Sequence, residues 1–283
     1  MPHPAIAAGR TAVIVGAASG IGLAAARAFA QRGLKVCLAD LPGDALNAAA
    51  KGLAGEGADV LAVAVDAAQP ADLERLRDAT YARFGEVAVL MNNAGIGAGA
   101  GAWEHPERWR NLMAVNLWGV VHGVQAFAPA MLAQGTPSAI VNTGSKQGIT
   151  NPPGNLAYNV SKAGVKALTE GLAHELRNVE GGQVSAHLLV PGFTFTGMTR
   201  GGGGEKPPGA WTGAQVAEFM IERMGEGAFY ILCPDNDVTR EMDEKRIQWA
   251  ADDLILDRPA LSRWHPDFKA AFEDFMSRPA RTR

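Results

Sequence analysis

Short apolar runs alternate along the chain with stretches whose apolar residues recur at helical spacing. The runs predict seven strands, over 11–15, 35–39, 60–64, 87–91, 139–142, 184–190 and 229–232. The helical stretches predict helices over 20–32, 41–52, 70–84, 109–133 and 156–178. Strands that are apolar throughout and separated by helices indicate a parallel sheet buried on both faces. The pattern therefore predicts an α/β fold: one domain with a doubly wound, Rossmann-type sheet of seven parallel strands flanked by helices.

Two parts of the chain depart from this alternation. Residues 194–210 contain four consecutive glycines and a proline pair, and they follow the sixth predicted strand. We expect them to form a flexible lid, with a plain connecting loop as the alternative. A charged helix over about 240–252 and a short helix over about 267–276 belong to an extra helical tail, about 240–283. The division expected within the domain is a cofactor half, about 10–140, and a catalytic and substrate half, about 140–283.

Composition excludes several classes of protein. Hydrophobic residues make up 47% of the 283 positions and charged residues 19%, so a sizeable core can form. The net charge of −3 gives no electrostatic case for nucleic acid or an anionic membrane as partner. No apolar run approaches the ~18 residues that span a bilayer, and the first residues do not match a signal peptide. Cys37 and Cys233 lie in apolar runs and no Cys/His spacing fits a metal, so we expect buried thiols, no metal and a cytoplasmic protein.

A tyrosine and a lysine lie four residues apart in the helix predicted over 156–178, at Tyr158 and Lys162. This spacing puts both side chains on one helix face. A lysine ammonium beside a phenol favours the phenolate, so the spacing predicts a lowered pKa for Tyr158. Such a phenol is suited to acid or base work near neutral pH.

The first predicted strand leads into a glycine-rich turn, Gly16-Ala17-Ala18-Ser19-Gly20-Ile21-Gly22. Glycines here permit a tight turn and close backbone approach to a pyrophosphate, which the helix N-terminus attracts. Asp40 follows the second strand, where a carboxylate accepts hydrogen bonds from ribose hydroxyls and repels a 2′-phosphate. These features favour NAD over NADP. The alternative is that Asp40 is only a helix N-cap or a turn residue.

These motifs together resemble the short-chain dehydrogenase/reductase family. The turn has the family's G-x-x-x-G-x-G spacing, Asn92-Asn93-Ala94-Gly95 matches its N-N-A-G, and Ser145 precedes Tyr158 by the family's thirteen residues. With Asn116 they occur in the family's order. Val15 stands where the family usually has threonine, and the region beyond about residue 199 diverges.

The resemblance implies four catalytic roles. Tyr158 exchanges a proton with the substrate oxygen, and Ser145 hydrogen-bonds that oxygen. Lys162 lowers the Tyr158 pKa and binds the nicotinamide ribose. Asn116 holds a water that relays protons from Lys162.

The resemblance also implies contacts with a dinucleotide. Asp66, helped by the backbone of Ala67, binds the adenine, and Thr196 binds the nicotinamide carboxamide with Thr194 as a second contact. The full set of expected cofactor-binding residues is Gly16, Ser19, Gly20, Ile21, Gly22, Asp40, Asp66, Ala67, Asn93, Ala94, Gly95, Tyr158, Lys162, Pro191, Gly192, Thr194 and Thr196.

The expected activity is NAD(H)-dependent interconversion of a secondary alcohol and a ketone. Gln147, Phe193, Met198 and Trp211 are expected around the substrate, and their mostly apolar character favours a bulky hydrophobic or aromatic molecule. The family's long helices pair subunits, which implies a homodimer or homotetramer. The alternatives are a non-catalytic dinucleotide-binding sensor or scaffold on the same fold, and an epimerase or dehydratase. The presence of both Tyr158 and Lys162 counts against the sensor.

Overall fold

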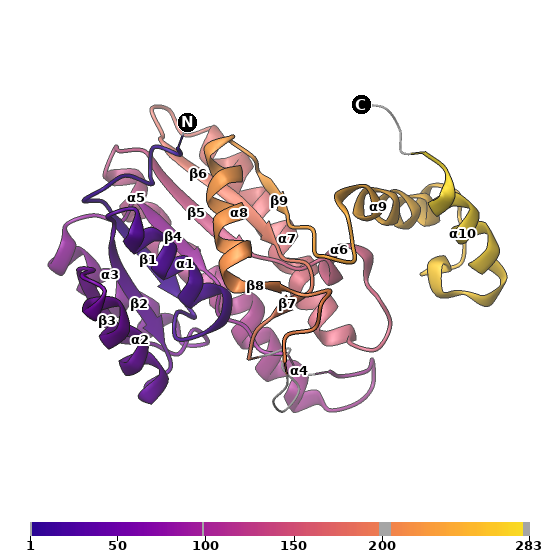
Figure 1. Ribbon diagram of the computed structural model, residues 1–283, viewed down its shortest axis with the longest axis horizontal. Coiled ribbons are helices and arrows are strands. Elements are labelled where there is room, and N and C mark those ends of the chain that lie inside the picture. The colour runs from indigo at the N-terminus through magenta and orange to yellow at the C-terminus, as the bar shows by residue number, and fades with distance from the viewer. Residues whose placement is uncertain (1, 98, 198–204, 280–283) are drawn as a thin grey trace.

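Seven parallel strands form one sheet, in the order β3-β2-β1-β4-β5-β6-β9 (Figure 1). The structure is a computed structural model and describes residues 2–97, 99–197 and 205–279. The strands are β1 Thr11–Val15, β2 Lys35–Asp40, β3 Val60–Ala64, β4 Val89–Asn92, β5 Ser138–Thr143, β6 Val184–Val190 and β9 Tyr230–Leu232. The predicted sheet is confirmed. Its strand order reverses direction between β1 and β4, which is where doubly wound sheets bind ligands.

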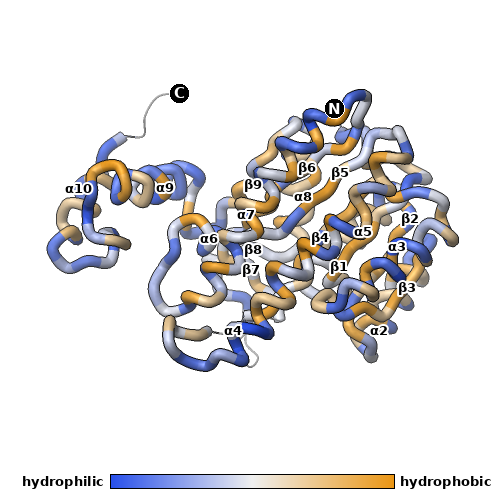
Figure 2. The backbone as a smooth tube through the Cα atoms, turned by 180° about the vertical axis from the view of Figure 1, so that it is seen from behind, coloured by the Kyte–Doolittle hydropathy of each residue, from blue (hydrophilic) through white to orange (hydrophobic). Residues whose placement is uncertain are grey.

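Helices cover both faces of the sheet. One layer contains α1 (Gly20–Gln31), α2 (Asp44–Gly55) and α8 (Gly213–Gly225). The other contains α3 (Pro70–Phe84), α5 (Gly119–Ala133) and α7 (Leu156–Arg177). Successive residues of β1 alternate between the two cores, because side chains alternate across a strand. All five are therefore buried, as predicted from the unbroken apolar run. Figure 2 shows these apolar strands enclosed within the body.

Several predicted helices have other limits in the structure. α2 begins at Asp44 instead of residue 41, because Gly43 precedes it with a φ of 154° that an α-helix does not contain. The helix predicted over 109–133 consists of α4 (Pro106–Met113), the π-helical turn η1 (Ala114–Trp118) and α5. α7 ends at Arg177, one residue earlier than predicted.

Further elements were not predicted: α6 (Gln147–Thr150), the two-stranded sheet of β7 (Thr194–Phe195) and β8 (Trp211–Thr212), α8, and the 3-10 turn η2 (Ser262–Trp264). The N-terminus of α8 carries a capping box, in which Thr212 and Gln215 bond each other's backbone. That sequence signal was available. β7 forms the start of the predicted lid and β8 follows its end, and residues 198–204 of the lid lie outside the described part of the chain. The flexibility of the lid stays a prediction.

The C-terminal helices α9 (Arg240–Ile255) and α10 (Lys269–Ser277) stand away from the sheet, as the yellow end of the ribbon in Figure 1 shows. They have a small core of their own around Trp249, which is 4% exposed and contacts the rings of Phe272 and Phe275. The Arg258 guanidinium lies 4.0 Å from the Trp249 ring centre. α9 contacts the body at α6, next to the carboxyl end of β5. Within residues 2–97, 99–197 and 205–279 no helix has the length and apolar character to span a membrane.

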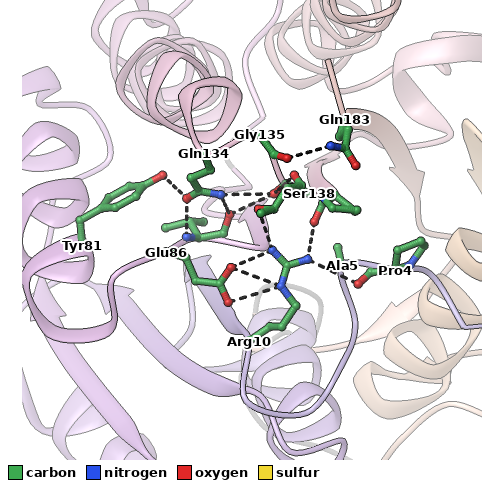
Figure 3. Close-up of polar contacts among 12 residues, drawn as sticks. Pro4, Ala5, Arg10, Tyr81, Glu86, Gln134, Gly135, Ser138 and Gln183 are labelled. Atoms are coloured by element: carbon green, nitrogen blue, oxygen red, sulfur yellow. Dashed lines mark hydrogen bonds and ion pairs between the residues drawn. The ribbon is translucent and has the colours of Figure 1, made fainter. Parts of the chain in front are cut away.

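A polar network joins the amino ends of β1, β4 and β5, at the edge opposite the carboxyl ends of the strands (Figure 3). Arg10 donates to Glu86 at 2.7 Å and also to the carbonyl of Pro137. Gln134 bonds both the N–H and the C=O of Val87, at 2.8 and 3.0 Å. The Arg10 side chain is 16% exposed, so its loss leaves a poorly hydrated carboxylate and carbonyl.

We expect Arg10→Met to lower the free energy of unfolding by about 1–3 kcal/mol, because it removes several charged hydrogen bonds at once. Urea unfolding measures the change. Arg27→Met is the matched control: its ion pair with Glu56 is far more exposed, and about 0.5 kcal/mol or less is expected there. Equal effects for the two variants would contradict this view of the network.

Candidate active site

The loops at the carboxyl ends of the strands surround a cavity of about 900 Å³. Residues following β1, β2, β3, β4, β5 and β6 line it, together with the first turns of α7. Most of the residues predicted from the sequence are among its walls: Gly16, Ser19, Gly20, Ile21, Asp40, Ala67, Asn93, Ala94, Gly95, Ser145, Gln147, Tyr158, Lys162, Pro191, Gly192, Phe193, Thr194 and Thr196.

The glycine turn is packed so tightly that side chains are excluded. Gly16 has a φ of 83°, and a Cβ there would lie 2.7 Å from the backbone of Ala94. A Cβ on Gly22 would lie 2.0 Å from the carbonyl oxygen of Gly16, so Gly22 supports the turn from behind and does not itself line the cavity. The N-terminus of α1 therefore opens onto the cavity, with no side chain at Gly16 or Gly20. Backbone N–H groups at a helix N-terminus fit a pyrophosphate.

Asp40 joins the glycine turn to the end of β2. Its carboxylate accepts hydrogen bonds from the N–H groups of Ala18 and Leu41, each at 2.8 Å, and it lines the cavity. α2 begins four residues later with Gly43 as its N-cap. The alternative of Asp40 as a helix N-cap is therefore wrong, whereas a role in the turn coexists with exposure to the cavity.

Asp66 does not line the cavity, although Val65 and Ala67 on either side of it do. The Asp66 carboxylate accepts a hydrogen bond from the N–H of Ala68 at 2.9 Å, and its own N–H donates to Asp72 at 2.8 Å. The carboxylate thus closes the turn between β3 and α3. Ala67 lines the cavity and is open to the predicted adenine contact, whereas the Asp66 side chain does not line it.

Buried amides join β4, β5 and α7 beneath the cavity. Asn92 donates to Asn142 at 2.9 Å, and Asn142 donates to Thr169 at 3.1 Å. Asn93 donates to the carbonyl of Gly16 at 3.1 Å and accepts from Thr143 at 3.2 Å. The N-N-A-G segment therefore fixes the glycine turn relative to the end of β5.

Ser145 and Tyr158 meet at the cavity wall. Ser145 lies directly beyond β5, and its Oγ accepts a hydrogen bond from the N–H of Gln147 at 3.2 Å. Tyr158 lies in the first turn of α7 and packs against Ala157 and Leu112. Burial raises the pKa of Tyr158 above its ordinary value, and a hydrogen bond with Ser145 offsets part of this rise. The expected lowering of the Tyr158 pKa by Lys162 is therefore wrong for the protein without cofactor, because desolvation of the phenol dominates.

Lys162 is 4% exposed and lines the cavity one helical turn beyond Tyr158. Its ammonium donates to the carbonyl of Thr143 at 2.8 Å and lies 5.8 Å from the centre of the Tyr158 ring. Burial lowers the pKa of Lys162 to about 8. The prediction that Tyr158 and Lys162 share one face of the helix is confirmed. Burial nevertheless disfavours the charged form of Lys162.

Asn116 lies on the π-helical turn η1 and is fully buried. Its Oδ1 accepts from the N–H of Ile96 at 2.8 Å, and its Nδ2 donates to the Ile96 carbonyl at 3.0 Å. The side chain thus holds the loop after β4 and does not line the cavity. A π turn widens the backbone locally, which is common at functional sites. The water relay predicted for Asn116 stays a prediction.

One of the predicted substrate residues, Trp211, is not in the cavity wall. Trp211 packs edge-on against Phe219, with ring centres 5.7 Å apart, beside the core between α1 and α8. Met198 lies outside the described residues. Sequence reasoning missed Val115 and Gly144, which line the cavity together with Lys146. Gly144 is an immediate neighbour of Ser145, so its position on the loop after β5 was the available signal.

Comparison with known proteins agrees with this architecture. The family model for short chain dehydrogenases matches residues 10–204. The 1-deoxy-11-beta-hydroxypentalenate dehydrogenase of Streptomyces exfoliatus is 35% identical over 264 residues, which cover 90% of this chain and 94% of that protein. A short-chain dehydrogenase/reductase from Burkholderia phymatum, solved with NAD, is 36% identical with a TM-score of 0.81, over 90% of this chain and 97% of its own.

A third relative carries the phosphorylated cofactor. The alcohol dehydrogenase of Thermococcus sibiricus, solved with 5-hydroxy-NADP, is 28% identical with a TM-score of 0.69, over 76% of this chain and 90% of its own. The chain belongs to the short-chain dehydrogenase/reductase family. These relatives support an alcohol dehydrogenase or reductase that uses a nicotinamide dinucleotide. The closely packed glycines of the turn and the size of the cavity fit such a cofactor.

Proposed function

We propose that the protein is an NAD(H)-dependent oxidoreductase that interconverts a secondary alcohol and a ketone, with Tyr158 as acid and base. The single observation that carries the proposal is the meeting of Ser145, Tyr158 and Lys162 in the wall of a cavity that also contains the glycine turn. A phenol that titrates above its usual pKa is fully protonated at neutral pH and is suited to donate a proton to a ketone oxygen.

Each of the three side chains has a distinct part in this mechanism. The nicotinamide gives or accepts the hydride when the cofactor is bound. Tyr158 gives its phenol proton to the forming alkoxide during reduction, and its deprotonated form takes the alcohol proton during oxidation. The Ser145 hydroxyl bonds the same oxygen and stabilises charge there. Lys162, held by the Thr143 carbonyl, supplies positive charge beside the phenol and a donor for a ribose hydroxyl. Asn116 holds the loop at Ile96, and a water bound nearby would connect Lys162 to solvent.

The proposed cofactor site follows the glycine turn from the N-terminus of α1 to the loop after β6. Bare backbone at Gly16 and Gly20 receives the pyrophosphate. Ala67 lies where an adenine would pack, and Thr194 and Thr196 lie at the nicotinamide end. A Cβ on Gly20 would lie 3.2 Å from the methyl group of Thr196. The glycine turn and the loop after β6 are therefore adjacent.

The proposed substrate is a bulky hydrophobic or aromatic alcohol or its ketone. Phe193 and Ile96 supply apolar wall near Ser145, and Phe193 is 43% exposed. Gln147 adds one polar side chain to this wall.

The proposed assembly is a homodimer or homotetramer. Trp118 on η1 and Leu156 and Val160 on α7 are large apolar side chains exposed on the surface. Contact between subunits through these helices would cover them.

We expect Asp40→Ala to reduce the preference for NAD over NADP by about tenfold or more, because the carboxylate that repels a 2′-phosphate is removed. The ratio of kcat/KM with the two coenzymes measures the change. Asp72→Ala, at a carboxylate outside the cavity, is the control and leaves the ratio unchanged. An unchanged ratio in Asp40→Ala would remove the argument for NAD.

The alternative function is a dinucleotide-binding sensor or scaffold without turnover. The absorbance of the reduced nicotinamide, followed with NAD and NADP in parallel against aliphatic, aryl and steroid-like secondary alcohols and their ketones, separates the two. Coenzyme-linked turnover of one substrate class supports the dehydrogenase. Tight coenzyme binding with no turnover of any compound would favour the sensor.

A further inference from the structure

Lys146 follows Ser145 directly in the cavity wall, and its ammonium reaches the C-terminal helix α9. Its ammonium lies 2.6 Å from Asp243 Oδ2 on α9 and 3.5 Å from Asp235 Oδ2 in the loop after β9. The side chains are 19%, 6% and 4% exposed, respectively. One lysine thus pairs with two buried aspartates that are remote from it in sequence. Buried charges of this kind persist only when they are paired.

Asp235 extends the network to the other side of the cavity. Its Oδ2 also accepts the N–H of Phe193 at 3.0 Å, while its Oδ1 accepts the N–H of Val238 at 2.7 Å. Gly192 lies so close that a Cβ there would be 2.7 Å from Asp235 Oδ2 and 3.1 Å from the Lys146 ammonium. The Asp235 carboxylate therefore contacts both the backbone of Phe193, in the cavity wall, and the ammonium of Lys146, the residue after Ser145.

Asp243 brings α9 into this network. Burial raises the pKa of Asp243, and Lys146 opposes that rise by favouring the charged carboxylate. A second, small cavity of about 50 Å³ lies between α6 and the C-terminal helices. Lys146 and Asp243 line it together with the cations Arg246 and Arg263. Because α6 begins right after Lys146, the position of α9 is transmitted to the loop that carries Ser145.

We propose that Lys146, Asp235 and Asp243 form a positioning clamp, completed by α9, that fixes the Ser145 loop relative to the substrate wall at Phe193. The inference rests on the proposed function and extends it to the C-terminal helices. It makes Lys146 a positioning residue that acts through its neighbours. With Lys146 committed to two carboxylates, it is not the residue that binds an anionic group of the substrate.

Asp243→Asn in the full chain tests the clamp, with Glu241→Gln as the matched control. Glu241 is in the first turn of the same helix, pairs with Lys245 and is 54% exposed. We expect Asp243→Asn to lower kcat/KM for the alcohol that the wild type oxidises fastest, among cyclohexanol, 1-phenylethanol, 1-indanol and a 3-hydroxysteroid, by about tenfold. The dissociation constant of the coenzyme stays within about twofold, because the glycine turn is not part of the clamp. Glu241→Gln changes neither quantity.

Two further measurements make the outcome decisive. Lys146→Arg keeps the charge and retains most of the activity, whereas Lys146→Met loses it as Asp243→Asn does. Hydrogen exchange on the full chain is expected to speed up at Phe193 and around Ser145 in Asp243→Asn, and not in Glu241→Gln. This result needs no turnover, so it still tests the clamp if the proposed function fails. Unchanged kinetics with unchanged exchange, tighter binding of an anionic substrate, or an equal loss of coenzyme binding would each overturn the proposal.

Discussion

Tyr158→Phe is expected to lower kcat/KM for alcohol oxidation by about 10²–10⁴-fold, which is the range for removing a positioned acid or base. The ring keeps its packing against Ala157 and Leu112, so the fold and the cavity are retained. The dissociation constant for the coenzyme therefore stays within about twofold. Steady-state kinetics and a fluorescence titration with the reduced coenzyme measure the two quantities.

Tyr81→Phe is the control for this change. The Tyr81 hydroxyl bonds Gln134 at the opposite edge of the sheet, as Figure 3 shows, and its loss leaves turnover unchanged. Full activity in Tyr158→Phe would exclude the proposed mechanism. Loss of coenzyme binding together with turnover would instead indicate a structural role.

Lys162→Met is expected to stabilise the protein at pH 7 while reducing turnover by about 10²-fold or more. Burial lowers the Lys162 pKa from 10.5 to about 8. Such a shift corresponds to a penalty of about 3 kcal/mol at neutral pH. Methionine fills a similar volume without the charge. It leaves the Thr143 carbonyl without its donor, at a cost of about 1 kcal/mol, so a net gain of about 2 kcal/mol remains.

The pH dependence of this gain identifies its cause. Between pH 8 and 10.5 the unfolded chain binds more protons at Lys162 than the folded chain does, so wild-type stability rises with pH across that window. The advantage of Lys162→Met over the wild type should therefore shrink to near zero by about pH 10. Urea unfolding of both proteins without coenzyme, at neutral and alkaline pH, gives the difference. A destabilised Lys162→Met at pH 7 would contradict the assigned desolvation.

The strands were the most predictable part of the fold, because parallel strands buried on both faces are continuous apolar runs. Val184–Val190 and Thr11–Val15 have the limits predicted from such runs. The interruption of the helix around Asn116 was not visible, because a π turn depends on contacts with the loop at Ile96 and not on local spacing. α8 was missed although Thr212 and Gln215 carry a capping signal.

Proximity within the site was predictable where motifs follow parallel strands, since all their carboxyl ends meet at one edge. The pKa shifts and the ion pairs within the site were not predictable from the sequence. Spacing places Lys162 beside Tyr158, but the sign of the tyrosine pKa shift depends on how deeply both groups are buried. Likewise, Lys146 and Asp235 are 89 residues apart in sequence, so their pairing depends on the tertiary fold.

The most direct measurement of the central claim is isotope transfer from the substrate to the coenzyme. The protein is incubated with NAD and the best alcohol of the panel, deuterated at the carbinol carbon, and the reduced coenzyme is analysed by mass spectrometry. The proposed function predicts one deuterium in each molecule of reduced coenzyme and one molecule of ketone for each, with the signal strongly reduced in Tyr158→Phe. Coenzyme that binds but never carries deuterium, across the whole panel and with NADP as well, would contradict it.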